Sequence, residues 1–261
     1  MTDADERPLL TADGLTKWYG RQLGCRDAGF ELYAGEVMAV VGESGSGKST
    51  LLQLLSGQME PSGGRVLYRL RDGTVADLWQ MNEPMRRFLF RTDWGYVHQD
   101  AQLGLRMGIS AGGNVGERLM AVGWRNYAAI RNSAMDWLDR VEIDRGRIDD
   151  TPGTYSGGMR QRLQIARNLV TAPRLVFMDE PTGGLDVSVQ ARLLDLLRRL
   201  VSDLNIAAIV VTHDLAVARL LSNRIMVMKA GEVVEAGLTD RLLDDPHEPY
   251  TQLLVSSVLP A

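Results

Sequence analysis

The sequence contains a single cysteine, Cys25, and this scarcity excludes several kinds of site. One cysteine cannot form an internal disulfide, a multi-cysteine zinc site or a cysteine-held iron–sulfur cluster. No uncharged apolar run approaches the ~18 residues that a membrane-spanning helix needs. The acidic N-terminus, from Met1 to Arg7, lacks the basic and apolar layout of a secretion signal. We therefore expect a cytoplasmic protein that does not itself insert into a membrane.

An excess of basic residues is also absent. The 261 residues include 29 Lys and Arg against 33 Asp and Glu, a formal net charge of −4, so the charge balance gives no indication of nucleic-acid binding. The hydrophobic content of 45% and the charged content of 24% are ordinary for a globular protein. The length is sufficient for one large domain, or for a domain with an additional lobe.

The most informative feature present is a glycine-rich run that matches the pattern G-x-x-x-x-G-K-[ST]. An apolar stretch at 37–41 precedes it and predicts a buried strand, and residues 51–55 after it predict a helix. The run consists of Gly42, Glu43, Ser44, Gly45, Ser46, Gly47, Lys48, Ser49 and Thr50.

Binding of a nucleoside triphosphate needs this combination of residues. Glycines let backbone N–H groups approach the phosphates, and the helix that follows directs its positive end at the same charge. Lys48 adds a cation at the β- and γ-phosphates, and Ser49 offers a hydroxyl group to Mg²⁺. A purely structural glycine turn is the alternative, and the strand–loop–helix context disfavours it.

The order of apolar segments is typical of an α/β fold. Short apolar runs at 175–178 and 206–211 predict strands, and residues 189–204 between them have helical spacing. Residues 225–235 predict a hairpin. Residues 103–150 predict a mostly helical lobe, and residues 71–93 a polar surface excursion.

Further motifs in a fixed order resemble those of the ABC-type ATPases. Residues 155–162, Tyr-Ser-Gly-Gly-Met-Arg-Gln-Arg, are similar to that family's L-S-G-G-Q signature. The family's other expected elements are Tyr19, Gln99, Asp179 with Glu180, Asp186 and His213. The resemblance covers about residues 9–255 and leaves a short tail at 256–261. It implies a RecA-like P-loop ATPase core of α/β class, with an antiparallel β subdomain and an inserted helical lobe at about 103–160.

The resemblance also implies a role for each matched residue in binding and hydrolysing ATP with Mg²⁺. Tyr19 would stack on adenine, and Asp186 would belong to the nucleotide-binding set. Asp179 would act near the metal, and Glu180 would be the general base that activates water. The alternative for Tyr19 is an ordinary aromatic residue at an interface, and the alternative for Asp179 and Glu180 is a solvated turn.

Gln99 and His213 complete the expected catalytic set together with Lys48. Gln99 would contact Mg²⁺ and the attacking water, and His213 would contact the γ-phosphate. The alternative for a lone histidine is a structural role. Ser49, Gln99 and Asp179 are thus the expected metal ligands.

The signature residues indicate the oligomeric state. Ser156, Gly157 and Gly158 begin an expected helix and would form a second anion-binding N-terminus. In the family this second loop closes on ATP held by another subunit, which implies a head-to-tail dimer that sandwiches two ATP molecules. The sequence departs from the signature at Tyr155 and at Met159, and methionine cannot make the hydrogen bonds of glutamine.

Two regions point to different partners. The tail at 245–254 resembles ATP-binding subunits of peptide and nickel importers. The segment 103–119, continued by Tyr127, Ile130 and Arg131 and by the stretch 68–93, resembles the ATP-binding subunit of the carbon–phosphorus lyase system.

We therefore predict an ATP-binding and hydrolysing subunit that acts with the soluble carbon–phosphorus lyase core complex in phosphonate catabolism. The alternative is the motor subunit of a peptide, nickel or phosphonate importer. A ribosome or DNA-repair protein is disfavoured, because such chains usually have two cassettes or a long coiled coil. Arg106 and Arg118, which flank a glycine-rich segment expected to be flexible (108–116), are the expected docking residues, and the alternative is that both are solvated surface charges.

Overall fold

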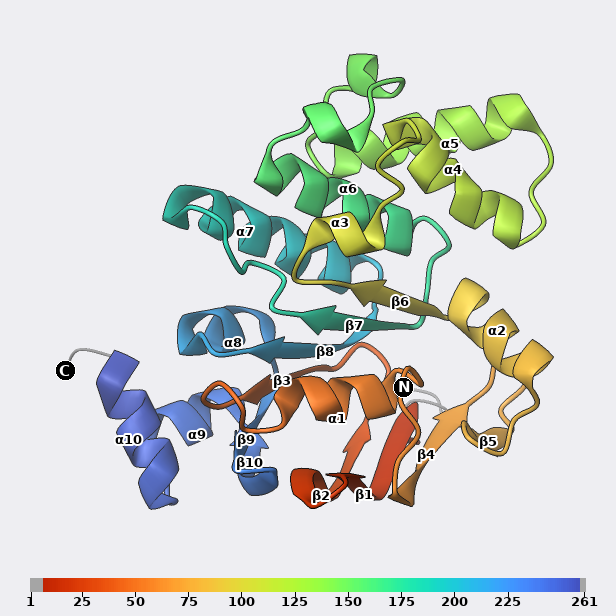
Figure 1. The fold of residues 1–261 in the computed structure, drawn as a ribbon. Helices are drawn as coiled ribbons and strands as arrows, with labels where there is room; N and C mark the ends of the chain where they lie inside the picture. Colours follow the sequence, from red (N-terminus) through yellow and green to blue (C-terminus); the bar gives the residue numbers. More distant parts are fainter. Residues whose placement is uncertain (1–6, 259–261) are drawn as a thin grey trace. The chain divides into compact units, whose positions relative to one another are not determined.

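A computed structural model describes residues 7–258 (Figure 1). In this structure the chain forms two compact units. Among the described residues, the first unit comprises 7–86 and 207–258, and the second comprises 87–206. The expected helical lobe at about 103–160 lies within the second unit, whereas the single domain expected over 9–255 stays a prediction. Residues 1–6 of the acidic N-terminus and 259–261 of the expected tail lie outside the described residues.

The first unit combines an antiparallel subdomain with a parallel core. Its strands follow the order β5-β4-β1-β2-β10-β9-β3-β8. β1 pairs antiparallel with β2 and β4, whereas β3 runs parallel to both β8 and β9. The elements are β1 (Leu10–Tyr19), β2 (Gln22–Leu32), β3 (Val37–Val41), α1 (Lys48–Leu55), β4 (Gly63–Arg69), β5 (Val75–Asp77), β8 (Ala207–Thr212), α8 (Leu215–Leu221), β9 (Arg224–Lys229), β10 (Glu232–Leu238), α9 (Thr239–Asp244) and α10 (Pro249–Val258).

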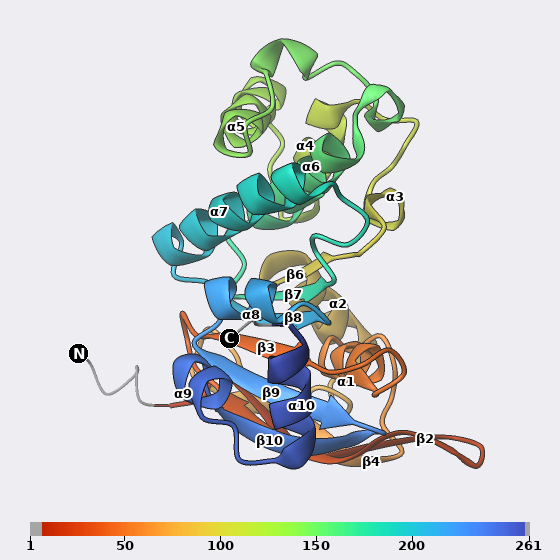
Figure 2. The same ribbon diagram turned by 90° about the vertical axis from the view of Figure 1, so that its left-hand side faces the viewer.

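β3 and β8 are buried along their whole length, which explains why each is a continuous apolar run instead of an alternating one. The predicted strands at 37–41 and 206–211 and the hairpin at 225–235 are thus confirmed. α8, α9 and α10 lie near β3 and β9 (Figure 2). Residues of these five elements form one apolar cluster, which includes Leu215, Leu242 and Tyr250. No helix in the described part of the chain is both long and apolar enough to cross a bilayer.

The second unit contains two parallel strands and a group of helices. Trp94 to Val97 of β6 pair in register with Leu175 to Met178 of β7. The elements are β6 (Trp94–Val97), α3 (Ala101–Gly104), α4 (Ala111–Ala121), α5 (Tyr127–Arg140), the short 3₁₀ helices η1 (Arg145–Arg147) and η2 (Pro152–Thr154), α6 (Gly157–Leu169), β7 (Leu175–Asp179) and α7 (Val187–Asp203). α2 (Glu83–Thr92) spans the boundary between the units and, like β5, belongs to the stretch expected to be a surface excursion.

The glycines at 112–116 lie inside helix α4, so the expectation of a flexible segment is wrong there. A Cβ atom on Gly112 would lie 2.5 Å from Ile148 Cγ1, and one on Gly116 would lie 2.7 Å from Ile130 Cγ2. These glycines therefore allow neighbouring segments of the unit to approach the helix closely, which side chains of any size would prevent.

Candidate nucleotide-binding site

The glycine-rich loop connects β3 to α1, as the motif requires. Gly47 has a φ of 101° and precedes the helix, and a Cβ atom there would lie 2.4 Å from Gly24 O. A Cβ atom on Gly42, whose φ is 149°, would lie 2.2 Å from Met228 O. Glycine is thus required at both positions by the backbone conformation and by the neighbouring chain. The fit of the loop to phosphate depends on this conformation.

Lys48 folds back over the loop that it ends. Its Nζ atom donates hydrogen bonds to Gly42 O and Glu43 O, both at 2.7 Å, and the residue is only 7% exposed. The ammonium group therefore lies inside the curve of the loop, where a phosphate group would meet it. The role expected from the sequence, a cation at the β- and γ-phosphates, stays a prediction.

Tyr19 lies beside the start of α1. Its hydroxyl group is 3.3 Å from Thr50 Oγ1, and its ring packs on Gly24, where a Cβ atom would approach Tyr19 Cε2 to 2.7 Å. The residue is 44% exposed, which leaves ring surface free to receive a planar ligand next to the loop. The aromatic residue predicted to stack on adenine is therefore adjacent to the predicted phosphate loop.

His213 lies at the same sheet edge as the glycine-rich loop. Val41 at the end of β3 pairs with Thr212 at the end of the parallel strand β8, so Gly42 and His213 each come directly after the paired residues. Ligands of α/β sheets bind at this carboxyl edge of the strands. Asp214 then caps α8 through the Ala216 N–H at 2.8 Å, which fixes the turn after His213.

Within the second unit, Gln99 and the two acidic residues also share a carboxyl edge. Val97 pairs with Met178, so Gln99 and Glu180 each come two residues after this pair. A Cβ atom on Gly183 would lie 3.0 Å from Gln99 Nε2, which shows that the Gln99 side chain rests on the loop after Glu180. Glu180 has a φ of 43°, a left-handed conformation that is uncommon for glutamate. Such backbone strain is frequent at functional sites.

The signature residues form the beginning of α6, as predicted. Ser156 is the N-cap of the helix, and its Oγ accepts a hydrogen bond from Met159 N at 3.3 Å. A Cβ atom on Gly158 would lie 2.5 Å from Val189 Cγ1, so the signature packs closely on the start of α7, where Asp186 is the N-cap. The structure therefore brings Ser156, Gly157, Gly158 and Asp186 together.

Tyr155 and Met159, the two residues that differ from the family signature, both contact Arg147. Its guanidinium group lies 4.6 Å from the centre of the Tyr155 ring, and its Nη1 atom is 3.5 Å from Met159 Sδ. Tyr155 in turn donates a hydrogen bond to Arg147 O at 2.8 Å, and Asp150 pairs with Arg147 Nε at 2.7 Å. Arg147 was not predicted from the sequence, because no motif marks an arginine eight positions before Tyr155.

Arg118 is not the exposed docking residue that the sequence suggested. Its guanidinium group donates to Phe90 O at 3.3 Å and to Trp94 O at 3.0 Å, and its buried Nε atom has no hydrogen-bond partner among the described residues. Removal from water lowers the pKa of Arg118 to about 10, and the nearby charge of Arg167 adds to this effect. Arg106 differs: its side chain is 60% exposed and pairs with Glu117 at 2.6 Å.

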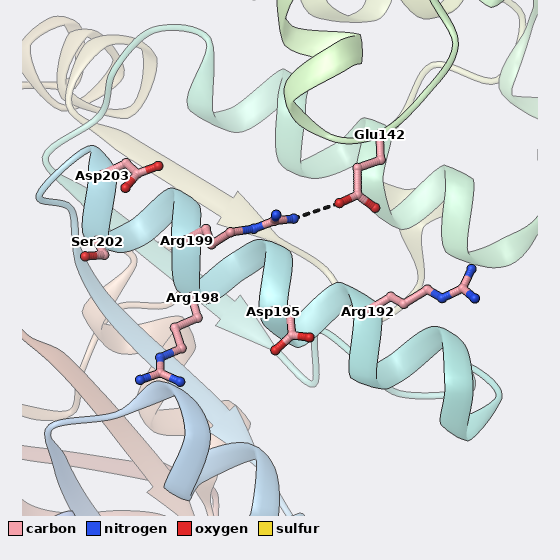
Figure 3. Close-up of a pocket in the computed structure, with 7 residues that line it drawn as sticks. All are labelled: Glu142, Arg192, Asp195, Arg198, Arg199, Ser202 and Asp203. Atoms are coloured by element: carbon pink, nitrogen blue, oxygen red, sulfur yellow. Dashed lines mark hydrogen bonds and ion pairs between the residues drawn. The ribbon is translucent and has the colours of Figure 1, made fainter.

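A pocket on the exposed face of α7 contains none of the expected nucleotide-binding residues (Figure 3). Arg199 reaches Glu142 across it at 2.7 Å. Arginine and acidic side chains alternate around the pocket, so it offers no excess of positive charge to an anion. The residues that line it are Glu142, Arg192, Asp195, Arg198, Arg199, Ser202 and Asp203.

The expected metal ligands are a hydroxyl (Ser49), an amide (Gln99) and a carboxylate (Asp179). These oxygen donors fit Mg²⁺, which proteins commonly hold through one or two side chains, substrate phosphates and water. In residues 7–258 no group of three or more His, Cys, Asp or Glu side chains could hold a metal ion. The chemistry of the three side chains is thus compatible with Mg²⁺ held together with substrate phosphates and water.

Known proteins resemble the chain over nearly its whole length. The model of the ABC transporter family matches residues 25–183. The putative phosphonates utilization ATP-binding protein PhnK of Escherichia coli is 62% identical over 253 residues, which are 97% of this chain and 98% of PhnK. The oligopeptide transport ATP-binding protein AmiE of Streptococcus pneumoniae is 37% identical over 240 residues, which are 89% of this chain and 66% of AmiE.

Two solved structures resemble the fold. The ATP-binding cassette MJ0796, in a dimeric post-hydrolysis state bound to ADP and Pi, gives a TM-score of 0.77 at 27% identity and covers 88% of this chain and 98% of that one. The protein cbiO1 from Clostridium perfringens, part of the ABC transporter complex cbiONQ, gives a TM-score of 0.79 at 28% identity and covers 92% of both chains. The predicted fold class is thus confirmed.

Proposed function

Because the chain belongs to the ABC transporter family of ATP-binding proteins, we propose that it is the ATPase subunit of a phosphonate-utilisation system. The observation that supports this proposal most strongly is the 62% identity to PhnK over nearly both whole chains. The peptide-transport relative AmiE fits less well at 37% identity. The finer proposal is that the partner is the soluble carbon–phosphorus lyase core complex, and the alternative is an importer permease.

In the proposed reaction, the first unit binds the nucleotide. The backbone N–H groups of the loop from Gly42 to Thr50 surround the phosphates, and Lys48 neutralises their charge. Tyr19 stacks on adenine, and His213 donates a hydrogen bond to the γ-phosphate. Most of the catalytic effect in phosphoryl transfer comes from positioning and charge neutralisation, which these residues supply.

The second unit supplies the groups that act on water. Glu180 accepts a proton from the attacking water, and Gln99 orients that water. Ser49, Gln99 and Asp179 would hold Mg²⁺, which when bound neutralises charge on the phosphates. The left-handed backbone conformation of Glu180 fixes the direction in which its side chain leaves the backbone, and this restricts where its carboxylate can lie.

We further propose that the active species is a head-to-tail dimer. Ser156, Gly157 and Gly158 would bind the ATP of the other subunit at the N-terminus of α6, and Asp186 would lie beside them. MJ0796, which has been solved as a dimer, gives a TM-score of 0.77 with this chain. Met159 offers only a thioether at this interface, so we expect weaker closure than glutamine would give.

Co-purification tests the choice of partner. The tagged chain, expressed from its own promoter in phosphate-starved cells, is expected to bring down the subunits of a soluble phosphonate-cleaving enzyme. Recovery of a membrane permease in their place would contradict the lyase assignment and favour the importer. The Lys48→Ala variant serves as a control that separates nucleotide-dependent association from constitutive docking.

A further inference from the structure

β6 is covered on one edge by side-chain amides instead of by a strand. Asn168 Oδ1 accepts a hydrogen bond from Tyr96 N at 3.0 Å, and Asn168 Nδ2 donates to Tyr96 O at 2.9 Å. At the end of the strand, Gln164 Oε1 accepts from His98 N at 2.7 Å, and Gln164 Nε2 donates to His98 O at 3.0 Å. Each amide therefore satisfies both backbone groups of one residue, as a paired strand would.

The spacing of helix and strand explains this match. Two residues along a strand advance by about 6.6 Å, and four residues along a helix advance by about 6.0 Å. Amides at positions i and i+4 of α6 can therefore face residues i and i+2 of an extended segment that runs the opposite way. Gln161, one turn earlier, donates a further hydrogen bond to His98 O at 3.1 Å.

These amides are buried, so their hydrogen bonds matter energetically. Gln164 is 0% exposed, Gln161 is 3% exposed and Asn168 is 7% exposed. A buried amide without its partners is costly, which means that the β6 segment and α6 hold each other in one register. Gly104 leaves the required room, because a Cβ atom there would lie 2.1 Å from Gln164 Oε1.

We infer that Gln164 is a positioning residue for ATP hydrolysis. It holds the backbone of His98, and the next residue is Gln99, whose side chain rests on Gly183 in the loop after Glu180. The same helix begins at the signature residues Gly157 and Gly158. α6 thereby links the signature to the residue expected to orient the attacking water. This inference rests on the proposed function.

The test compares Gln164→Ala with a matched buried amide. Asn114 is also 0% exposed, but its amide bonds the backbone of Arg106, Ile109 and Ser110 and, within the described part of the chain, makes no hydrogen bond to residues 96–100. Both alanine variants of the full-length chain are expected to lower the Tm. Only Gln164→Ala is expected to lower kcat, by about tenfold or more, with KM for ATP changed little.

Two further measurements separate positioning from general loss of structure. Amide hydrogen exchange of residues 96–100 is expected to accelerate in Gln164→Ala and to be unchanged in Asn114→Ala, with or without nucleotide. Gln164→Glu keeps the acceptor for His98 N and loses the donor to His98 O when ionised, so an intermediate kcat is expected.

If Gln164→Ala and the wild type have equal kcat per folded molecule, the inference about Gln164 is overturned. In that case the ATP hydrolysis measured for the wild-type chain still supports the proposed function. Unchanged exchange at residues 96–100 in Gln164→Ala would overturn it as well. Absence of ATP hydrolysis by the wild-type chain would overturn the proposed function, and the inference with it.

Discussion

The guanidinium group of Arg147 lies 4.6 Å from the centre of the Tyr155 ring, directly before the signature residues. The same group contacts Met159 Sδ at 3.5 Å, so both departures from the family signature share one neighbour. A planar cation on an aromatic face and an ion pair with Asp150 hold the segment that leads into α6. Arg147 thus fixes the position of the signature loop from the side of η1.

We expect Arg147→Ala to weaken ATP-dependent dimerisation about tenfold, because the loop before Ser156 loses its stacking and hydrogen-bonding partner. ATP binding to the monomer is expected to be unchanged. Light scattering in a Glu180→Gln background, which blocks hydrolysis, measures the dimer. Arg145→Ala is the control, because Arg145 is an exposed arginine of η1 that pairs with Asp139. Equal dimerisation of the two variants would contradict this role.

Lys48→Ala is expected to weaken ATP binding about 10- to 100-fold and to reduce turnover below detection, because the loop loses its cation at the phosphates. Fluorescent-nucleotide titration and phosphate release measure the two effects. Arg241→Ala removes the same charge from an exposed position in the same unit and is expected to behave as wild type. Undiminished turnover of Lys48→Ala in a clean preparation would refute the assignment of the loop.

Charge reversal is expected to destabilise the fold at Arg118 but not at Arg106, although the sequence suggested the same docking role for both arginines. Arg118→Glu would remove the guanidinium hydrogen bonds to Phe90 O and Trp94 O and place a carboxylate at a largely buried position, so we expect a loss of about 3 kcal/mol or more in the free energy of unfolding. Arg106→Glu would break only an exposed ion pair, which contributes about 0–1 kcal/mol. Urea unfolding distinguishes them, and equal losses would contradict this account of Arg118.

The buried thiol of Cys25 predicts a dependence of stability on alkaline pH. Burial raises the pKa of Cys25 from its ordinary value of 9.0 to about 11. Because the unfolded chain releases this proton first, the contribution is complete below about pH 9 and is lost as the pH rises towards about 11, by about 1.4 kcal/mol per unit. The Cys25→Ala variant lacks this component. Parallel stability curves of the two proteins above about pH 9 would contradict the prediction.

Local patterns in the sequence predicted several elements of the fold, whereas the antiparallel β subdomain was expected only from the family resemblance. The loop from Gly42 to Thr50 and the strand at 37–41 could be predicted, because their conformations are determined by residues that are close in sequence. The helix that begins after Ser156 and the hairpin at 225–235 were predicted for the same reason. The expected roles of the site residues, by contrast, stay predictions.

Features that depend on distant contacts were missed or misjudged. Gly112 and Gly116 suggested flexibility, but close contacts with Ile148 and Ile130 make them part of a packed helix. Arg118 resembled a surface charge until its carbonyl partners, 24 or more positions earlier, were known. Gln164 lies 66 residues from His98, and no local pattern distinguishes its amide from that of an exposed glutamine.

Growth on a phosphonate tests the central claim most directly. A strain of Escherichia coli that lacks PhnK is given this chain, with a phosphonate as the sole source of phosphorus. We expect the wild-type chain to restore growth, and Glu180→Gln to fail although it is produced at the same level, because its amide cannot accept the proton of the attacking water. Failure of the wild-type chain, or growth supported equally by Glu180→Gln, would contradict an ATPase that serves phosphonate utilisation.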